Sequence, residues 1–151
     1  MRARRHAVAA LALLLGAGLV AGCGEDDPAA GYCDTVAEHR TELSRTIEEG
    51  GGAGLLLALP TLADIAEEAP DDIADEWEEL VGGLEQLRDA LEDAGVEPEA
   101  YDPKRPPAGL STAEQQAIEE AADRVGSQES QLALGAIDQQ VRDVCHEPLT
   151  L

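Results

Sequence analysis

The clearest hydrophobic pattern in the chain predicts an amphipathic helix over residues 70–94. Large apolar residues recur there at steps of three and four, and acidic residues fill the positions between them. The apolar stripe consists of Ile73, Trp77, Leu80, Val81, Leu84, Leu87 and Leu91. Pro70 suits the first helical position and Gly95 suits a left-handed stop. Gly82 and Gly83 interrupt the pattern, and we interpret them as a close approach of another helix, with a functional hinge as the alternative.

Weaker apolar stripes predict two helices before this segment. The first covers residues 32–49, and the second covers residues 60–68 with Pro60 in its first turn. The glycines of residues 50–54 are expected to form a flexible loop between them.

Two further helical patterns follow, after a proline-rich connection over residues 95–110. Ser111 and Glu114 match a capping box, and Ser127 is placed to cap a last segment that reaches residue 145. No strand pattern competes with these helices. We therefore predict an all-α fold, a helical bundle of four or five helices.

The beginning of the chain has the charge order of an export signal. Three arginines lie within the first five residues, before an uncharged run over residues 7–22. The run ends in the sequence Val20, Ala21, Gly22 and Cys23, which resembles the lipobox of bacterial lipoproteins. This resemblance implies that Cys23 becomes the acylated first residue. We expect a signal peptide over residues 1–22, a lipidated tether over residues 23–31 and a helical bundle domain over residues 32–151.

Cys33 and Cys145 are the cysteines that remain after lipidation, and export favours a disulfide between them. The bond would join the first and last helices. A zinc site that combines the two cysteines with His39 and His146 is the alternative, although their spacing is not that of a zinc finger.

The bond also restricts the topology, because the bridged Cα atoms must lie within about 7 Å of each other. Residues 111–145 then form one kinked helix of a four-helix bundle, or the connection over residues 95–110 runs the length of the bundle. We favour the second arrangement, because a connection this long needs a reason.

The chain after Gly22 resembles small lipoproteins of actinobacteria. The residues that carry the resemblance are the lipobox, Tyr32 with Cys33, Ala69 and Pro70 followed by Ile73 and Trp77, and the closing Val144 and Cys145. The resemblance implies a place in the actinobacterial cell envelope. It implies no particular activity.

The charge of the chain excludes some partners. The residues from Cys23 onward carry 32 acids against seven Lys and Arg, a net charge of −25. Such a surface repels nucleic acid and anionic lipid headgroups, so we expect no nucleic acid partner and attachment to the membrane through acyl groups alone.

Few residues suggest catalysis or metal binding. His39 and Glu42 have the spacing of the His-x-x-Glu motif of imelysin-like periplasmic proteins, so a metal-binding or metal-dependent protein is one alternative. The sequence shows no flanked serine nucleophile, phosphate-binding glycine loop or metal triad. We expect no enzyme activity and no cofactor.

Acidic residues at the carboxyl ends of predicted helices give the main functional hypothesis. The helix dipole disfavours each of them there by about 0.3–1 kcal/mol. We expect Glu48, Glu49, Asp89, Glu92 and Asp93 to gather at the end of the bundle far from the membrane. This end would bind a basic protein or divalent cations such as calcium or magnesium. The protein is then a non-catalytic binding module, with a purely structural lipoprotein as the other alternative.

Overall fold

The computed structural model describes residues 29–105 and 108–151, and these contain helices and no strand. The elements are α1 (Ala30–Gly50), the 3₁₀ turn η1 (Gly51–Ala53), α2 (Gly54–Leu57), α3 (Leu59–Glu67), α4 (Ala74–Asp93), the 3₁₀ turn η2 (Pro98–Ala100), α5 (Thr112–Val125) and α6 (Gln128–Cys145). Because α2 is a single turn that leads into α3, the described part is a bundle of five helices. The all-α prediction is confirmed. The expected signal peptide, Cys23 and residues 24–28 of the expected tether lie outside the described residues.

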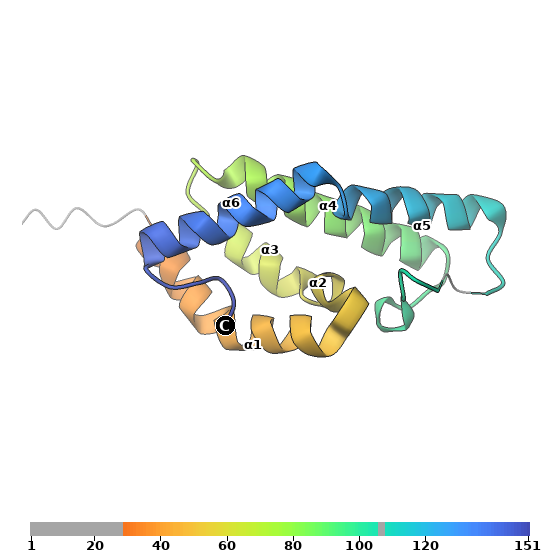
Figure 1. Cartoon of the computed structure of the whole chain (residues 1–151), viewed down its shortest axis with the longest axis horizontal. Coiled ribbons are helices and arrows are strands. Elements are labelled where there is room, and N and C mark those ends of the chain that lie inside the picture. Colours follow the sequence, from red (N-terminus) through yellow and green to blue (C-terminus); the bar gives the residue numbers. More distant parts are fainter. Residues whose placement is uncertain (1–28, 106–107) are drawn as a thin grey trace, which may run out of the picture.

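The helices run back and forth along one long axis (Figure 1). α1 runs away from the N-terminal end, α2 and α3 return, and α4 runs outward again. α5 and α6 then return end to end along the same side of α4, with a break at Gly126 and Ser127 (Figure 1). This broken path brings Cys145 back to the beginning of α1.

Our preferred path for the connection over residues 95–110 is wrong. α5 begins at the end of the bundle where α4 finishes, so the connection does not run the length of the bundle (Figure 1). Two of its residues instead pack in the core: Val96 and Tyr101 are both 9% exposed and lie in a small cluster with Leu91 and Ile118. Residues 111–145 therefore follow the less favoured of the two expected arrangements, one helical path along the bundle, which is broken between α5 and α6.

α4 is the central helix, although it begins later than the sequence predicts. Residues 70–73 form a turn in which the Ile73 N–H donates to the Pro70 carbonyl at 3.1 Å, and the helix begins at Ala74. It ends as predicted, because Gly95 follows with a φ of +67°. A Cβ at Gly83 would meet Val125 at an ordinary 3.7 Å, and one at Gly82 would meet nothing within 4 Å. Neither glycine therefore marks a close helix approach.

The glycines of residues 50–54 form a tight corner and not a flexible loop. Gly51 has a φ of +54° and begins η1, and α2 follows η1 without a gap. A Cβ at Gly54 would lie 2.9 Å from Ile47 Cα, so only glycine fits where α2 crosses the end of α1.

The last two helices begin as the sequence predicts. The Glu114 N–H donates to Ser111 Oγ at 3.3 Å, and the Ser111 N–H donates to Glu114 Oε2 at 2.7 Å, which completes the capping box. Ser127 accepts from the Ser130 N–H at 3.1 Å.

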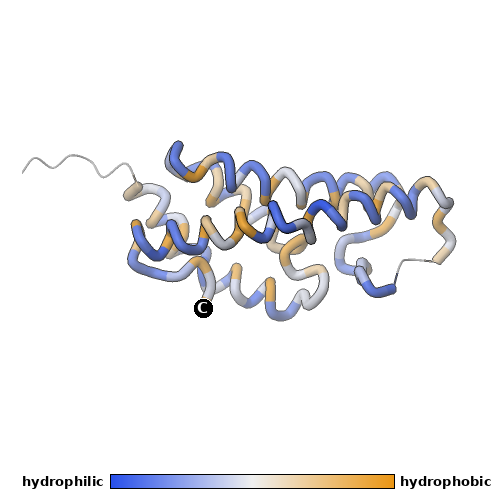
Figure 2. Tube along the Cα trace, turned by 45° about the horizontal axis from the view of Figure 1, so that its top comes forward, coloured by the Kyte–Doolittle hydropathy of each residue, from blue (hydrophilic) through white to orange (hydrophobic). Residues whose placement is uncertain are grey.

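The buried apolar residues form two clusters. Apolar and polar positions alternate along the helices (Figure 2). The larger cluster surrounds Trp77, which is 1% exposed and is the core anchor of the fold. The smaller one lies under α5 and contains Leu56, Leu87, Leu91, Val96, Tyr101, Ile118 and Ala121.

Candidate functional site

The disulfide between Cys33 and Cys145 joins the first turns of α1 to the last residue of α6. Its Cα atoms lie 5.2 Å apart, and both residues are partly buried against the larger core. The predicted bond is confirmed. Because both sulfur atoms are used in it, the alternative zinc site that needed these thiolates is wrong.

The chain after the disulfide folds back between α6 and α1. His146 reverses the chain with a φ of +59°, and Glu147 then pairs with Arg40 at 2.9 Å. Leu149 is 3% exposed, and the Leu151 N–H donates to Ser44 Oγ at 2.8 Å. The C-terminal residues thus cover one side of the bundle and have a structural role.

Tyr32 and Trp77 fix the core beneath the disulfide. Trp77 Nε1 donates to the Tyr32 hydroxyl at 3.1 Å, and the rings meet edge to face with centroids 6.4 Å apart. Burial raises the pKa of Tyr32, and the nearby negative charge of Asp72 raises it further. The sequence reading placed Trp77 in the core but did not identify this hydrogen bond, because two residues 45 positions apart show no shared pattern.

The five acids expected at the distal end are all exposed, and three of them pair within their own helices. Arg45 lies 3.5 Å from Glu49, and Arg88 lies 2.8 Å from Asp89 and 3.8 Å from Glu92. These arginines offset part of the unfavourable dipole interaction that motivated the hypothesis. Across residues 29–105 and 108–151, no group of three or more His, Cys, Asp or Glu side chains is placed to hold a metal ion. Glu48, Glu49, Asp89, Glu92 and Asp93 therefore form no coordination site.

His39 and Glu42 do not form a metal site with other residues either. Glu42 pairs with Arg45 at 3.8 Å, and no third ligand joins the two side chains within the part of the chain that the structure describes. Their spacing alone is the ordinary consequence of two polar residues on one helix face.

The structure reveals an open groove between α4 and α6 that the sequence reading missed. It has a volume of about 470 Å³ and is lined by Asp75, Glu76, Glu79, Glu129, Leu132, Ala133 and Ala136. Leu132 is 64% exposed, while Ala133 is 6% exposed. A signal was present in the sequence, since Leu132 lies off the apolar stripe of its helix.

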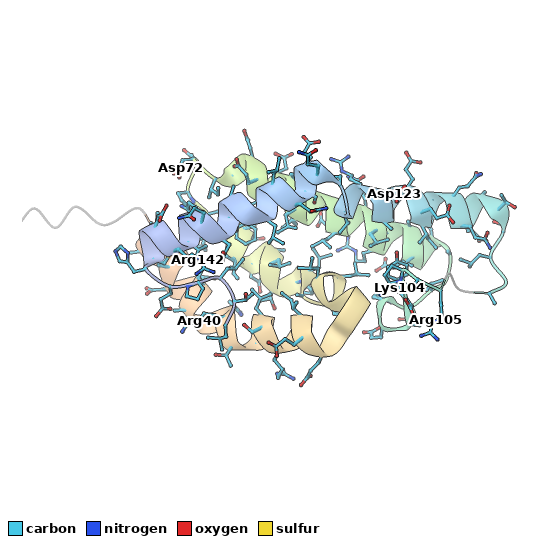
Figure 3. All side chains as sticks on the ribbon, viewed as in Figure 1. Arg40, Asp72, Lys104, Arg105, Asp123 and Arg142 are labelled. Carbon is cyan, nitrogen blue, oxygen red and sulfur yellow. A yellow bond between two sulfur atoms is a disulfide. The ribbon has the colours of Figure 1, made fainter. Side chains whose placement is uncertain are left out.

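A second groove, of about 580 Å³, lies between α1, α3 and α6. Its walls include Leu43, Ile47, Leu62 and Leu134, and Arg142 stands at its edge beside Asp138 at 2.9 Å. Both bases near it, Arg40 and Arg142, are occupied by carboxylates of this chain (Figure 3). This groove therefore offers apolar contact without a free charged group.

None of the helices in the described part is both long enough and apolar enough to cross a membrane. No family model, curated protein or solved structure that was compared with the chain matches it.

Proposed function

We propose that the protein is a lipid-anchored extracytoplasmic lipoprotein that binds a basic partner protein and catalyses no reaction. Its anchor is Cys23, at the end of the apolar run over residues 7–22. The Cys33–Cys145 disulfide supports a place outside the cytoplasm, because such bonds persist in oxidising compartments and are rare in the cytosol.

The binding role is supported by the large excess of acidic residues over the basic residues that can pair with them. All six arginines of the described residues already pair with carboxylates of the chain. The chain from Cys23 onward nevertheless carries 32 acids against seven Lys and Arg, and most carboxylates of the described residues form no ion pair. A basic partner relieves their mutual repulsion and is attracted from a distance, which speeds association.

This charge distribution favours a protein partner over a metal ion. A metal site needs several ligands converging on one point, and the described residues provide no such group. A protein with separate lysines and arginines can instead match carboxylates that are spread over several helices.

Crosslinking with a carbodiimide in intact cells tests the proposal, because this reagent joins carboxylates directly to amines. Lys104 is the chain's one lysine, so a Lys104→Arg variant forms adducts through its carboxylates and not through that side chain. We expect an adduct with a basic envelope protein, joined from an Asp or Glu of this chain to a lysine of the partner. A purely structural lipoprotein would give no discrete adduct, and that result would refute the binding role.

A further inference from the structure

Leu132 is the residue of the α4–α6 groove whose exposure the fold does not explain. The buried face of α6 carries Ser130, Ala133, Ile137 and Val141, and Leu132 lies beside that face with 64% of its surface exposed. One exposed leucine is ordinary on a protein surface. This leucine differs because it stands in a hollow, next to two alanines that are too small to fill the space between the helices.

The rim of this groove is negatively charged. Asp75 and Glu76 lie in the first turn of α4, Glu79 follows one turn later, and Glu129 lies in the first turn of α6. Acids in a first turn complement the helix dipole, which accounts for their presence but not for their arrangement around an apolar floor.

Among the described residues, a basic partner is found for one of these acids. Glu79 pairs with Arg124 at 3.2 Å, whereas Asp75, Glu76 and Glu129 form no ion pair with any described residue. The bases Lys104 and Arg105 lie in the connection below α5, away from α6 (Figure 3). The groove thus combines an apolar centre with uncompensated negative charge at its edge.

We propose that this groove binds a basic segment of a partner protein, with one large aliphatic side chain against Leu132, Ala133 and Ala136 and flanking lysines or arginines opposite Asp75, Glu76 and Glu129. Charge complementarity favours a basic occupant, because a second copy of this chain, with a net charge of −25 from Cys23 onward, would be repelled. The aliphatic side chain adds the selectivity that charge alone does not provide. This inference rests on the proposed function and specifies where the partner binds.

A short peptide tests the groove directly. The probe is a fluorescein-labelled peptide with one leucine, an alanine on each side of it, and two lysines at each end. Its binding to the full chain in phosphatidylcholine nanodiscs is followed by fluorescence anisotropy, with empty nanodiscs subtracted. A second peptide carries serine in place of leucine. We expect this serine peptide to bind about tenfold more weakly, because it loses the buried aliphatic contact.

Two pairs of variants locate the binding site. Leu132→Ser is matched by Leu151→Ser, which changes another exposed leucine. Asp75→Asn with Glu129→Gln is matched by Glu48→Gln with Glu49→Gln, which removes the same charge at the far end of α1. We expect each groove variant to weaken binding by about fivefold to tenfold and each matched variant by less than about twofold. Circular dichroism and the melting temperature of every variant show whether it remains folded.

The outcomes separate this inference from the proposed function. If the peptide binds but the matched variants weaken it as much as the groove variants do, the groove is not the site, although a basic partner is still bound. If the serine peptide binds as tightly as the leucine peptide, the surface attracts any polycation and the inference is wrong. If the unaltered chain binds neither peptide, the inference is wrong, whereas the proposed function is decided by the carbodiimide adduct.

Discussion

Cys33 and Cys145 are covalently joined although they lie 112 positions apart in the sequence. The bond fixes the beginning of α1 against the end of α6, and it closes nearly the whole domain into one loop. Arg40, Glu147 and the buried Leu149 reinforce the same junction without a covalent bond.

Replacing both cysteines, as Cys33→Ser with Cys145→Ser, is expected to lower the free energy of unfolding. For a loop of this length, the loss is at most about 4–5 kcal/mol in the chain-entropy model. Guanidinium denaturation with and without reductant measures it, and reduction of the unaltered protein should have nearly the same effect. A loss below about 1 kcal/mol would show that the bond contributes little.

Tyr32→Phe is expected to lower the free energy of unfolding by about 1–3 kcal/mol, because the buried Trp77 N–H then has no acceptor. Tyr101→Phe is a matched control. Tyr101 is the other tyrosine of the chain, and its hydroxyl forms no hydrogen bond with any described residue. We expect the control to change stability by less than about 0.5 kcal/mol. Equal losses in the two variants would contradict the role assigned to the Trp77 hydrogen bond.

The two tyrosines should ionise late in the folded protein. Burial raises the pKa of both Tyr32 and Tyr101 above the ordinary value of 10.0, and nearby acids raise them further. The unfolded chain therefore loses these protons first, so the tyrosines' contribution to the free energy of unfolding is fully present below pH 10.0 and is lost as the pH rises above it. Absorbance at the tyrosinate wavelength should show a midpoint above 10.0 in the folded protein and near 10.0 in guanidinium. The same midpoint in both conditions would refute this prediction.

Two glycine variants should change stability in opposite directions. Gly54→Ala forces a Cβ against the backbone of Ile47, so we expect it to lower the free energy of unfolding by more than about 1 kcal/mol. Gly82→Ala places a methyl group in open space within α4, where alanine is favoured by about 1 kcal/mol. The two melting temperatures decide the matter, and a stabilised Gly54→Ala variant would contradict the tight corner.

Local sequence signals predicted the elements of this fold well. The capping box at Ser111 and the stop at Gly95 depend on residues close in sequence, and the structure confirms both. Trp77 belonged to the longest apolar stripe, and it lies at the centre of the larger core.

The errors came from interactions between distant segments. The path of residues 95–110 depends on the burial of Val96 and Tyr101 under α5, which no local spacing reveals. The late start of α4 depends on the turn at residues 70–73, where Ile73 is buried before the helix begins. The groove at Leu132 exists because α4 and α6 pack side by side, which no local pattern predicts. The sequence showed only that Leu132 lies off the apolar stripe of its helix.

The intact mass of the protein recovered from cells tests the central claim, a lipid-anchored protein outside the cytoplasm, most directly. We predict a chain that begins at Cys23, carries acyl groups and gains the mass of two hydrogens on reduction, as Cys33 and Cys145 are released. A Cys23→Ser variant should lack the acyl groups and leave the membrane fraction. A chain that still begins with Met1 and contains free thiols at Cys33 and Cys145 would contradict the account.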